Sequence, residues 1–411
     1  MSNKVAISRV QGGDVESAVR DAVALAGGFE QRVTAGSRVL IKPNLCKAAP
    51  RGSGFVTDAG VVAAVAKLVL EMSPASVVIA EGAMAGYDSE GYPTDDALVV
   101  TGVAAVGRRL GVEVRNLNVD TWEEVEIPGA LVLDRIKIAT TVLESDVIIS
   151  VPVLKTHLRT HATLSLKNMN GATPGAEKRK SHRLGLDQAI ADLNSVIGPS
   201  YAIIDATTGM QGMWQIPGDS RQMGLIVAGS DPVYVDVVGA SLMGIDPAQI
   251  MHLQLAARRE GKQAALSAVD VVGEDLAGCR QSFRGAFDVF RSRFPQVDIV
   301  LGEGACSGCT AELVSALSYV AKAGFDEQMK GLTVVVGKPP AVAICGKAVA
   351  VGDCAKGMSD GAVHVPCCPP SDRDIIHGLC EACGVDGGLV LSTMEQTREK
   401  LWADSAAVLQ H

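Results

Sequence analysis

The chain has 411 residues, of which 47% are hydrophobic, and a formal net charge of −9. This length suffices for two or three domains, each with a core of its own. The negative charge disfavours a polyanionic partner, and an aromatic content of 4% leaves few side chains on which bases could stack. No apolar stretch is as long as a membrane helix and no secretory signal is visible, so we expect no membrane span, no nucleic-acid partner and a cytoplasmic location.

The first two-thirds of the chain alternates short β-branched runs with longer amphipathic stretches. We expect strands at 5–10, 38–42, 76–80, 112–117, 146–151, 202–205 and 225–228, and helices at 15–25, 59–71, 96–110, 186–197, 233–243 and 248–259. Apolar strands separated by helical patterns predict an α/β fold with a mostly parallel sheet covered by helices. Residues 121–137 look like an antiparallel excursion, so the predicted sheet is mixed.

The remaining residues predict a smaller C-terminal α/β domain of flavodoxin-like type. We expect a first domain at 1–284, a connecting helix at 285–295 and the cysteine-rich domain at 296–400. Its predicted strands lie at 297–301, 332–336, 342–344, 348–352 and 362–365, and its predicted helices at 310–323 and 371–379.

Eight of the ten cysteines lie between Cys306 and Cys383. Three groups each follow a predicted strand: C-S-G-C (Cys306, Cys309), G-D-C-A (Cys354) and V-P-C-C-P-P (Cys367, Cys368). Disulfide scaffolds are usually short secreted chains, whereas grouped cysteines in a reducing cytoplasm are more often metal ligands or catalytic thiols. Ligands of α/β sheets gather where strands end, so these loops predict a soft-metal centre.

Zinc and an iron–sulfur cluster both fit a cysteine-rich centre. Structural zinc sites use two close pairs, and the pairs Cys306 with Cys309 and Cys380 with Cys383 have that spacing. A zinc site built on them would leave Cys354 and Cys368 without a role. Cys345 is not assigned by either interpretation.

The order of these motifs resembles a known cluster-binding module. G-x-C-A followed by V-P-x-C-P-P, downstream of C-x-x-C, resembles the small subunits of NADH:quinone oxidoreductase and nickel–iron hydrogenase. The resemblance implies a [4Fe–4S] cluster held by Cys306, Cys309, Cys354 and Cys368. It also implies that Cys367 stands where glycine is usual.

Polar residues also end several strands of the first domain. They form the motifs K-P-N, A-E-G, K-T-H, L-K-N, I-D-A and S-D-P, and the candidate site residues are Lys42, Asn44, Glu81, Lys155, His157, Lys167, Asn168, Asp205 and Asp231. If the strands are neighbours, several cations meet at one sheet edge and suit a carboxylate or phosphate. Lys155, His157 and Lys167 are the catalytic candidates, because His157 can exchange a proton at neutral pH. The other six residues are the candidates for substrate binding.

The order of these motifs over residues 38–250 resembles the family catalogued as domain of unknown function 362. That family is regarded as iron–sulfur associated, and many of its members add a C-x₂-C-x₂-C-x₃-C-P run that this chain lacks. The resemblance extends distantly to the lactate racemase family, which uses a nickel cofactor.

Together these observations predict a [4Fe–4S] oxidoreductase of anaerobic metabolism that acts on or beside a small anionic substrate. A redox partner protein is expected, and a homodimer is left open. The alternatives are an electron-transfer or cluster-carrier protein without enzymatic activity, an iron–sulfur dehydratase or isomerase, and a zinc-stapled enzyme. Four cysteine ligands favour redox chemistry, because three would leave one iron open to a substrate.

Overall fold

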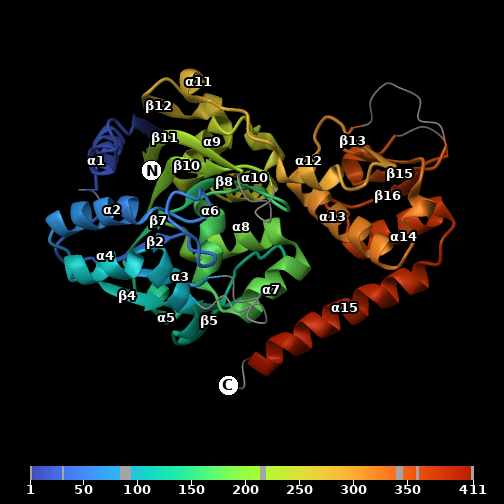
Figure 1. The fold of residues 1–411 in the computed structure, drawn as a ribbon, viewed down its shortest axis with the longest axis horizontal. Helices are drawn as coiled ribbons and strands as arrows, with labels where there is room; N and C mark the ends of the chain where they lie inside the picture. The colour runs from blue at the N-terminus through green and yellow to red at the C-terminus, as the bar shows by residue number, and fades with distance from the viewer. Residues whose placement is uncertain are drawn as a thin grey trace. The chain divides into compact units, whose positions relative to one another are not determined.

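The computed structural model describes residues 2–29, 32–83, 94–212, 219–338, 346–357 and 361–408. The chain forms two compact units, each with a sheet of its own (Figure 1). The first unit comprises Met1–Thr156, Ala162–Pro247 and His252–Phe283, and the second comprises His157–His161, Ala248–Met251 and Arg284–His411. The expected strand at 342–344 and Cys345 fall outside the described residues.

A mixed sheet of ten strands lies at the centre of the first unit, as far as the structure describes it. The strand order is β12-β1-β11-β10-β7-β2-β3-β4, and β8 joins the sheet between β10 and β9. The strands are β1 (Lys4–Arg9), β2 (Arg38–Pro43), β3 (Ser76–Glu81), β4 (Glu113–Asn116), β7 (Val147–Val151), β8 (Val153–His157), β9 (His161–Thr163), β10 (Tyr201–Met210), β11 (Ser220–Gly229) and β12 (Asp270–Gly273). The β10, β7, β2, β3 and β4 strands are parallel neighbours, whereas β11 runs antiparallel to β1 and β10. The predicted α/β class with a mostly parallel, mixed sheet is confirmed.

Helices cover both faces of this sheet because its central strands are apolar on both sides. Val39 and Ile41 of β2 pack into a core with α1, α2 and α4, and Leu40 between them faces a second core with α8 and the β5–β6 hairpin. The α1 and α2 helices lie side by side, drawn in blue in Figure 1. The helices are α1 (Val15–Leu25), α2 (Ala59–Glu71), α3 (Thr94–Val100), α4 (Val103–Leu110), α5 (Thr140–Leu143), α6 (Ser165–Asn168), α7 (Gly175–Leu184), α8 (Leu186–Ile197), α9 (Pro232–Leu242), α10 (Met251–Arg259) and α11 (Leu276–Cys279).

Three segments refine or correct the sequence-based expectations. The antiparallel excursion is the hairpin of β5 (Trp122–Glu126) and β6 (Arg135–Ala139). The single helix expected at 96–110 is two helices, because Gly102 has a φ of 88° that interrupts the helical path. The basic run around Lys178 lies in α7, a helix outside the ranges expected from the sequence.

The second unit is built on a four-stranded parallel sheet in the order β13-β14-β15-β16. Its strands are β13 (Val297–Leu301), β14 (Leu332–Val336), β15 (Ala348–Val351) and β16 (Val363–Val365), and its helices are α12 (Ala286–Arg291), α13 (Ser307–Lys322), α14 (Asp372–Cys383) and α15 (Gly387–Val408). These strands lie in chain order, so they lack the reversal of strand order found in flavodoxin itself. Because they are parallel, the loops that follow β13, β15 and β16 leave from one edge of the sheet.

Candidate functional site

A buried ion pair lies where β2 and β3 end. The Nζ of Lys42 contacts the carboxylate of Glu81, and the two side chains are 0% and 3% exposed. Burial lowers the pKa of Lys42 and raises the pKa of Glu81, and the attraction between the two groups opposes both shifts. A lysine with no exposed surface cannot reach a ligand that arrives from solvent. Lys42 and Glu81 therefore stabilise this edge of the sheet and do not bind a ligand themselves.

Asn168, at the end of α6, holds this pair and the β2 and β7 strands together. Its Oδ1 accepts hydrogen bonds from Lys42 Nζ at 3.3 Å and from Asn44 Nδ2 at 3.2 Å. Its Nδ2 donates to the carbonyl of Lys42 at 2.9 Å and to Ser150 Oγ at 3.0 Å. Since both polar atoms of the Asn168 amide already have protein partners, this side chain positions its neighbours.

Asn44 offers an acceptor that the protein does not use. Its side chain is 7% exposed, and its Oδ1 has no hydrogen-bond partner among the described residues. A buried amide oxygen without a partner costs free energy, and such atoms in native proteins commonly face a ligand or water. Asn44 is therefore the clearest pointer to a bound molecule in the first unit.

Two lysines lie close to each other beside this amide. Lys155 Nζ donates to the carbonyl of Phe55 at 2.8 Å and to Cys46 Sγ at 3.2 Å. Lys167, next to Asn168 in the chain, is partly exposed, and no hydrogen bond of its ammonium group is found among the described residues. Burial, followed by the charge of Lys155, lowers the pKa of Lys167 to about 8. We call Asn44, Lys155 and Lys167 the lysine site.

The short α6 helix that carries Lys167 is held by Asp236 of α9. Asp236 Oδ1 accepts from the Ser165 N–H at 2.8 Å, and Oδ2 accepts from the Leu166 N–H at 3.0 Å. Burial raises the pKa of Asp236 to about 6, although these hydrogen bonds oppose the shift. One carboxylate thus fixes the backbone just before Lys167.

The remaining predicted site residues are occupied in other ways. Asp205 accepts from the Asp58 N–H at 2.7 Å and from Thr207, and so ties β10 to the start of α2. Asp231 caps α9 and pairs with Lys262. Because β11 is antiparallel to β10, its C-terminal end carries Asp231 to the sheet edge opposite to Lys42. His157 Nδ1 accepts from the N–H groups of Arg159 and Thr160, both at 3.2 Å, which orders its own turn.

In the second unit, the cysteines of three loops meet at the carboxyl edge of the sheet. Cys306 caps α13 and Cys309 lies in its first turn, while Cys354 follows β15 and Cys368 follows β16. The Cys309 thiol is hydrogen bonded with Cys306 and interacts with the charges of Cys354 and Cys368. The hydrogen bond with Cys306, burial and these charges together raise the pKa of Cys309. We call Cys306, Cys309, Cys354 and Cys368 the four-cysteine group.

Hydrogen bonds fix the loops after β15 and β16 against each other. The Cys367 N–H donates to Asp353 Oδ1 at 2.8 Å, and the Asp353 N–H donates to the Cys367 carbonyl at 3.1 Å. Cys367 has a φ of 103°, a conformation that favours glycine. A Cβ on Gly308 would lie 2.3 Å from Met251 Sδ and 3.4 Å from Pro369 Cγ, so a side chain there would displace Met251.

Two further cysteines of this unit, Cys380 and Cys383, form a separate pair on α14. Cys380 interacts with Cys383 and Asp386, and burial raises its pKa to about 11.

Among the described residues, no three His, Cys, Asp or Glu side chains close around one point as the ligands of a single ion would. A cube of iron and sulfide is larger than one ion, so its thiolates stand farther apart than the ligands of zinc.

Comparison with known proteins finds a match in the first unit. Residues 39–241 match the family model described as Domain of unknown function (DUF362). This part of the chain is similar to DUF362. A thylakoid-associated protein of Synechocystis, sll1697, is 28% identical over 253 residues, which cover 58% of this chain and 73% of that protein. The lactate racemase apoprotein of Thermoanaerobacterium thermosaccharolyticum aligns over 59% of this chain and 57% of its own length, with 11% identity and a TM-score of 0.39.

The DUF362 match includes the whole lysine site and its supports, from Lys42 to Asp236. The four-cysteine group lies outside the matched residues. Sequence reasoning missed two residues of the matched part. Cys46 stands two positions after the K-P-N motif, and Lys178 donates to the carbonyls of Gly82 and Ala83 at 2.7 and 2.9 Å. The short distance of Cys46 from Asn44 in the sequence is the signal that could have identified it.

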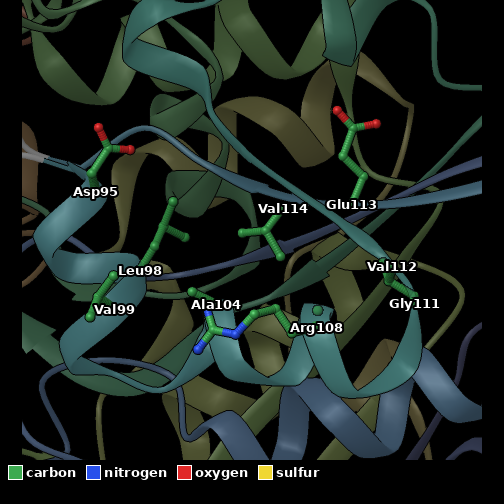
Figure 2. Close-up of a pocket in the computed structure, with 10 residues that line it drawn as sticks. Asp95, Leu98, Val99, Ala104, Arg108, Gly111, Val112, Glu113 and Val114 are labelled. Atoms are coloured by element: carbon green, nitrogen blue, oxygen red, sulfur yellow. The ribbon is translucent and has the colours of Figure 1, made fainter.

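A hollow of about 540 Å³ also lies between α3, α4 and β4. Figure 2 shows Arg108, Asp95 and Glu113 around it, with Leu98, Val99, Ala104 and Val114 between them. Its lining contains no residue of the lysine site, so we assign it no role in binding.

In the described part of the chain, no helix is both long and apolar enough to span a membrane.

Proposed function

We propose that this chain is an iron–sulfur oxidoreductase. Its second unit would hold a [4Fe–4S] cluster through the four-cysteine group, and the lysine site of its first unit would bind a small carboxylate or phosphate. The observation that carries the proposal is the meeting of Cys306, Cys309, Cys354 and Cys368 at one sheet edge, although they come from three separate loops.

The donor set fits a cluster. Four cysteine thiolates are the usual ligands of a [4Fe–4S] cluster, and when bound it accepts and donates single electrons. Cys306 and Cys309 lie at the N-terminal end of α13, where backbone N–H groups and the helix dipole favour negatively charged sulfur. Gly352 keeps room beside these sulfurs, since a Cβ there would lie 2.8 Å from Cys309 Sγ.

The grouping of the cysteines supports a cluster over zinc. A zinc staple would join Cys306 and Cys309 with Cys380 and Cys383. Cys309 instead interacts with Cys354 and Cys368, while Cys380 interacts with Cys383. Oxidation to disulfides would remove the ligands, so the protein would work in a reducing compartment such as the cytoplasm. A redox partner protein would exchange electrons with the cluster.

The lysine site supports an enzyme over a simple electron carrier. An electron carrier has no need for two neighbouring lysines next to a buried amide oxygen that has no partner in the described part of the chain. Lys155, Lys167 and Asn44 together offer donors for an anionic group and one acceptor for a hydroxyl or N–H group.

A pair of adjacent cysteines gives the test of the cluster. Cys368→Ser removes a proposed ligand, whereas Cys367→Ser changes the adjacent cysteine, which is not a proposed ligand. Both proteins are purified without oxygen and reconstituted with ferrous iron and sulfide. Iron, sulfide and zinc contents and electron paramagnetic resonance spectra are then measured.

Cys368→Ser should lose the reducible signal and most of the bound iron, whereas Cys367→Ser should retain both. Equal iron in the two variants would reject the ligand assignment. Stoichiometric zinc without iron in the wild-type protein would reject the cluster.

A further inference from the structure

Cys46 lies beside the lysine site and has no role in the proposed function. Its side chain is partly exposed, and its Sγ accepts a hydrogen bond from Lys155 Nζ at 3.2 Å. The sulfur also lies close enough to Lys42 and Lys167 to favour the charged form of each. An ammonium group that donates to sulfur stabilises the thiolate, which is the nucleophilic form of cysteine.

A second observation points to a ligand in this part of the first unit. Asn44, two residues before Cys46, has a buried Oδ1 without a partner among the described residues. Its Nδ2 is fixed by Asn168, the neighbour of Lys167 in the chain. A cysteine sulfur, a buried amide oxygen and two lysines thus belong to one small region.

We propose that Cys46 is the nucleophile of the lysine site and attacks an electrophilic carbonyl carbon of a small anion held by Lys167. The sulfur electron pair forms the C–S bond, and the π pair of the carbonyl moves onto oxygen. That oxygen takes a proton from the Lys155 ammonium group, which becomes an amine. The reverse step returns the proton to Lys155 and frees the thiolate. This inference rests on the anion site of the proposed function and does not depend on the cluster.

Lys155 is well placed for both parts of this step. It donates to the sulfur before the attack, and the Phe55 carbonyl at 2.8 Å and the Phe55 ring at 4.6 Å hold its ammonium group in position. Lys167 is the better candidate for the anionic group, because no hydrogen bond of its ammonium is found among the described residues.

Two alkylating reagents test the assignment on the reduced full-length chain. Iodoacetate carries a carboxylate and iodoacetamide does not, and ordinary thiols react faster with iodoacetamide. Each reagent transfers its carbon to sulfur and releases iodide. Rates at individual cysteines are read by peptide mass spectrometry.

Cys46 should react with iodoacetate about tenfold faster than with iodoacetamide, the low end of what a cationic cleft adds to the capture of an anion. Lys167→Gln should abolish this preference. Lys67→Gln, which removes the same charge from a partly exposed lysine of α2 that pairs with Glu16, should preserve it. Cys279, the other cysteine of the first unit, is 7% exposed beside Arg9 and should remain unmodified.

Wild-type Cys46 that prefers iodoacetamide, as ordinary thiols do, would overturn the assignment, and this result needs no variant. Calorimetry with sulfate separates the two proposals. If sulfate binds the wild-type chain but not Lys167→Gln and Cys46 still shows no preference for iodoacetate, the nucleophile is rejected and the anion site stands. If sulfate does not bind, the anion site itself is rejected.

Discussion

At the scale of single residues, burial separates side chains that look equivalent in the sequence. Lys42 and Lys167 each follow an apolar residue, and an asparagine comes one or two positions after each of them. The structure gives Lys42 a carboxylate partner and no exposed surface, and leaves Lys167 partly exposed with a lowered pKa. Only the second of these lysines can gain a new partner from solution.

The lowered pKa of Lys167 predicts a pH dependence of anion binding. The ammonium form, which binds an anion, predominates below pH 8 and is lost as the pH rises through about 8. We expect the affinity for sulfate, whose charge is constant in this range, to fall about tenfold between pH 7 and pH 9.

Isothermal calorimetry measures this affinity. Lys167→Arg keeps its charge throughout the range, so its affinity for sulfate should stay nearly constant. A wild-type affinity that is also constant from pH 7 to pH 9 would show that Lys167 is not the group that binds the anion.

At the scale of elements, the α6 helix depends on a carboxylate from another helix, and two glycines leave the space that neighbouring side chains need. The four-residue α6 helix is too short to be stable alone, and Asp236 supplies the acceptors for its first N–H groups. Gly171 and Gly352 leave space for the buried ion pair and for a cysteine, respectively. Each of these contacts joins residues far apart in the sequence.

Gly171→Ala should destabilise the first unit. A Cβ at this position would lie 2.5 Å from both Lys42 Nζ and Glu81 Oε1, so the buried ion pair would have to move. We expect a loss of about 1–3 kcal/mol in the free energy of unfolding, measured by urea denaturation. Gly36→Ala is the control, since a Cβ there meets no atom within 4 Å. Equal stability of the two variants would show that the packing around the ion pair is loose.

Gly352→Ala should weaken the binding of iron. The added Cβ would lie 2.8 Å from Cys309 Sγ and would displace that sulfur. Gly357→Ala is a matched control in the same loop: its φ is 99° against 90° for Gly352, so both variants strain the backbone, but no atom lies within 4 Å of its Cβ position. After reconstitution, iron per chain should fall for Gly352→Ala and remain at the wild-type value for Gly357→Ala. A similar fall in both would attribute the effect to backbone strain alone.

At the scale of the whole molecule, the two candidate sites belong to two units with separate sheets. The lysine site belongs to the ten-stranded sheet and the four-cysteine group to the four-stranded one. A metal centre stabilises the structure that holds it, because the unfolded chain lacks the assembled ligands.

Removal of iron should therefore loosen the second unit far more than the first. Hydrogen exchange read by mass spectrometry can follow peptides from β14 and α14 on one side and from β2 and α2 on the other. Iron chelation should speed hydrogen exchange in the peptides of β14 and α14 and leave exchange in those of β2 and α2 nearly unchanged. Cys368→Ser protein should already show the faster rates without a chelator. Equal changes in both units, or none, would contradict a cluster confined to the second unit.

The sequence alone was enough to predict the α/β class and most elements. Apolar strands and amphipathic helices follow local periodicity, so α1, α2 and β14 begin and end where the pattern predicts. Local breaks are harder to see, as at Gly102, where the direction of the backbone depends on a positive φ. The cysteine motifs predicted loops at strand ends, and these loops follow β13, β15 and β16 of a parallel sheet.

The tertiary structure decided which polar residues face one another. Strand direction sends Asp231 to the opposite edge from Lys42, and no local pattern in β11 reveals that it is antiparallel. The pairing of Glu81 with Lys42 and the approach of Cys46 to Lys155 are both contacts between distant parts of the chain. Periodicity is a property of neighbours in the sequence, whereas a binding site depends on strand order and on the space that packing leaves.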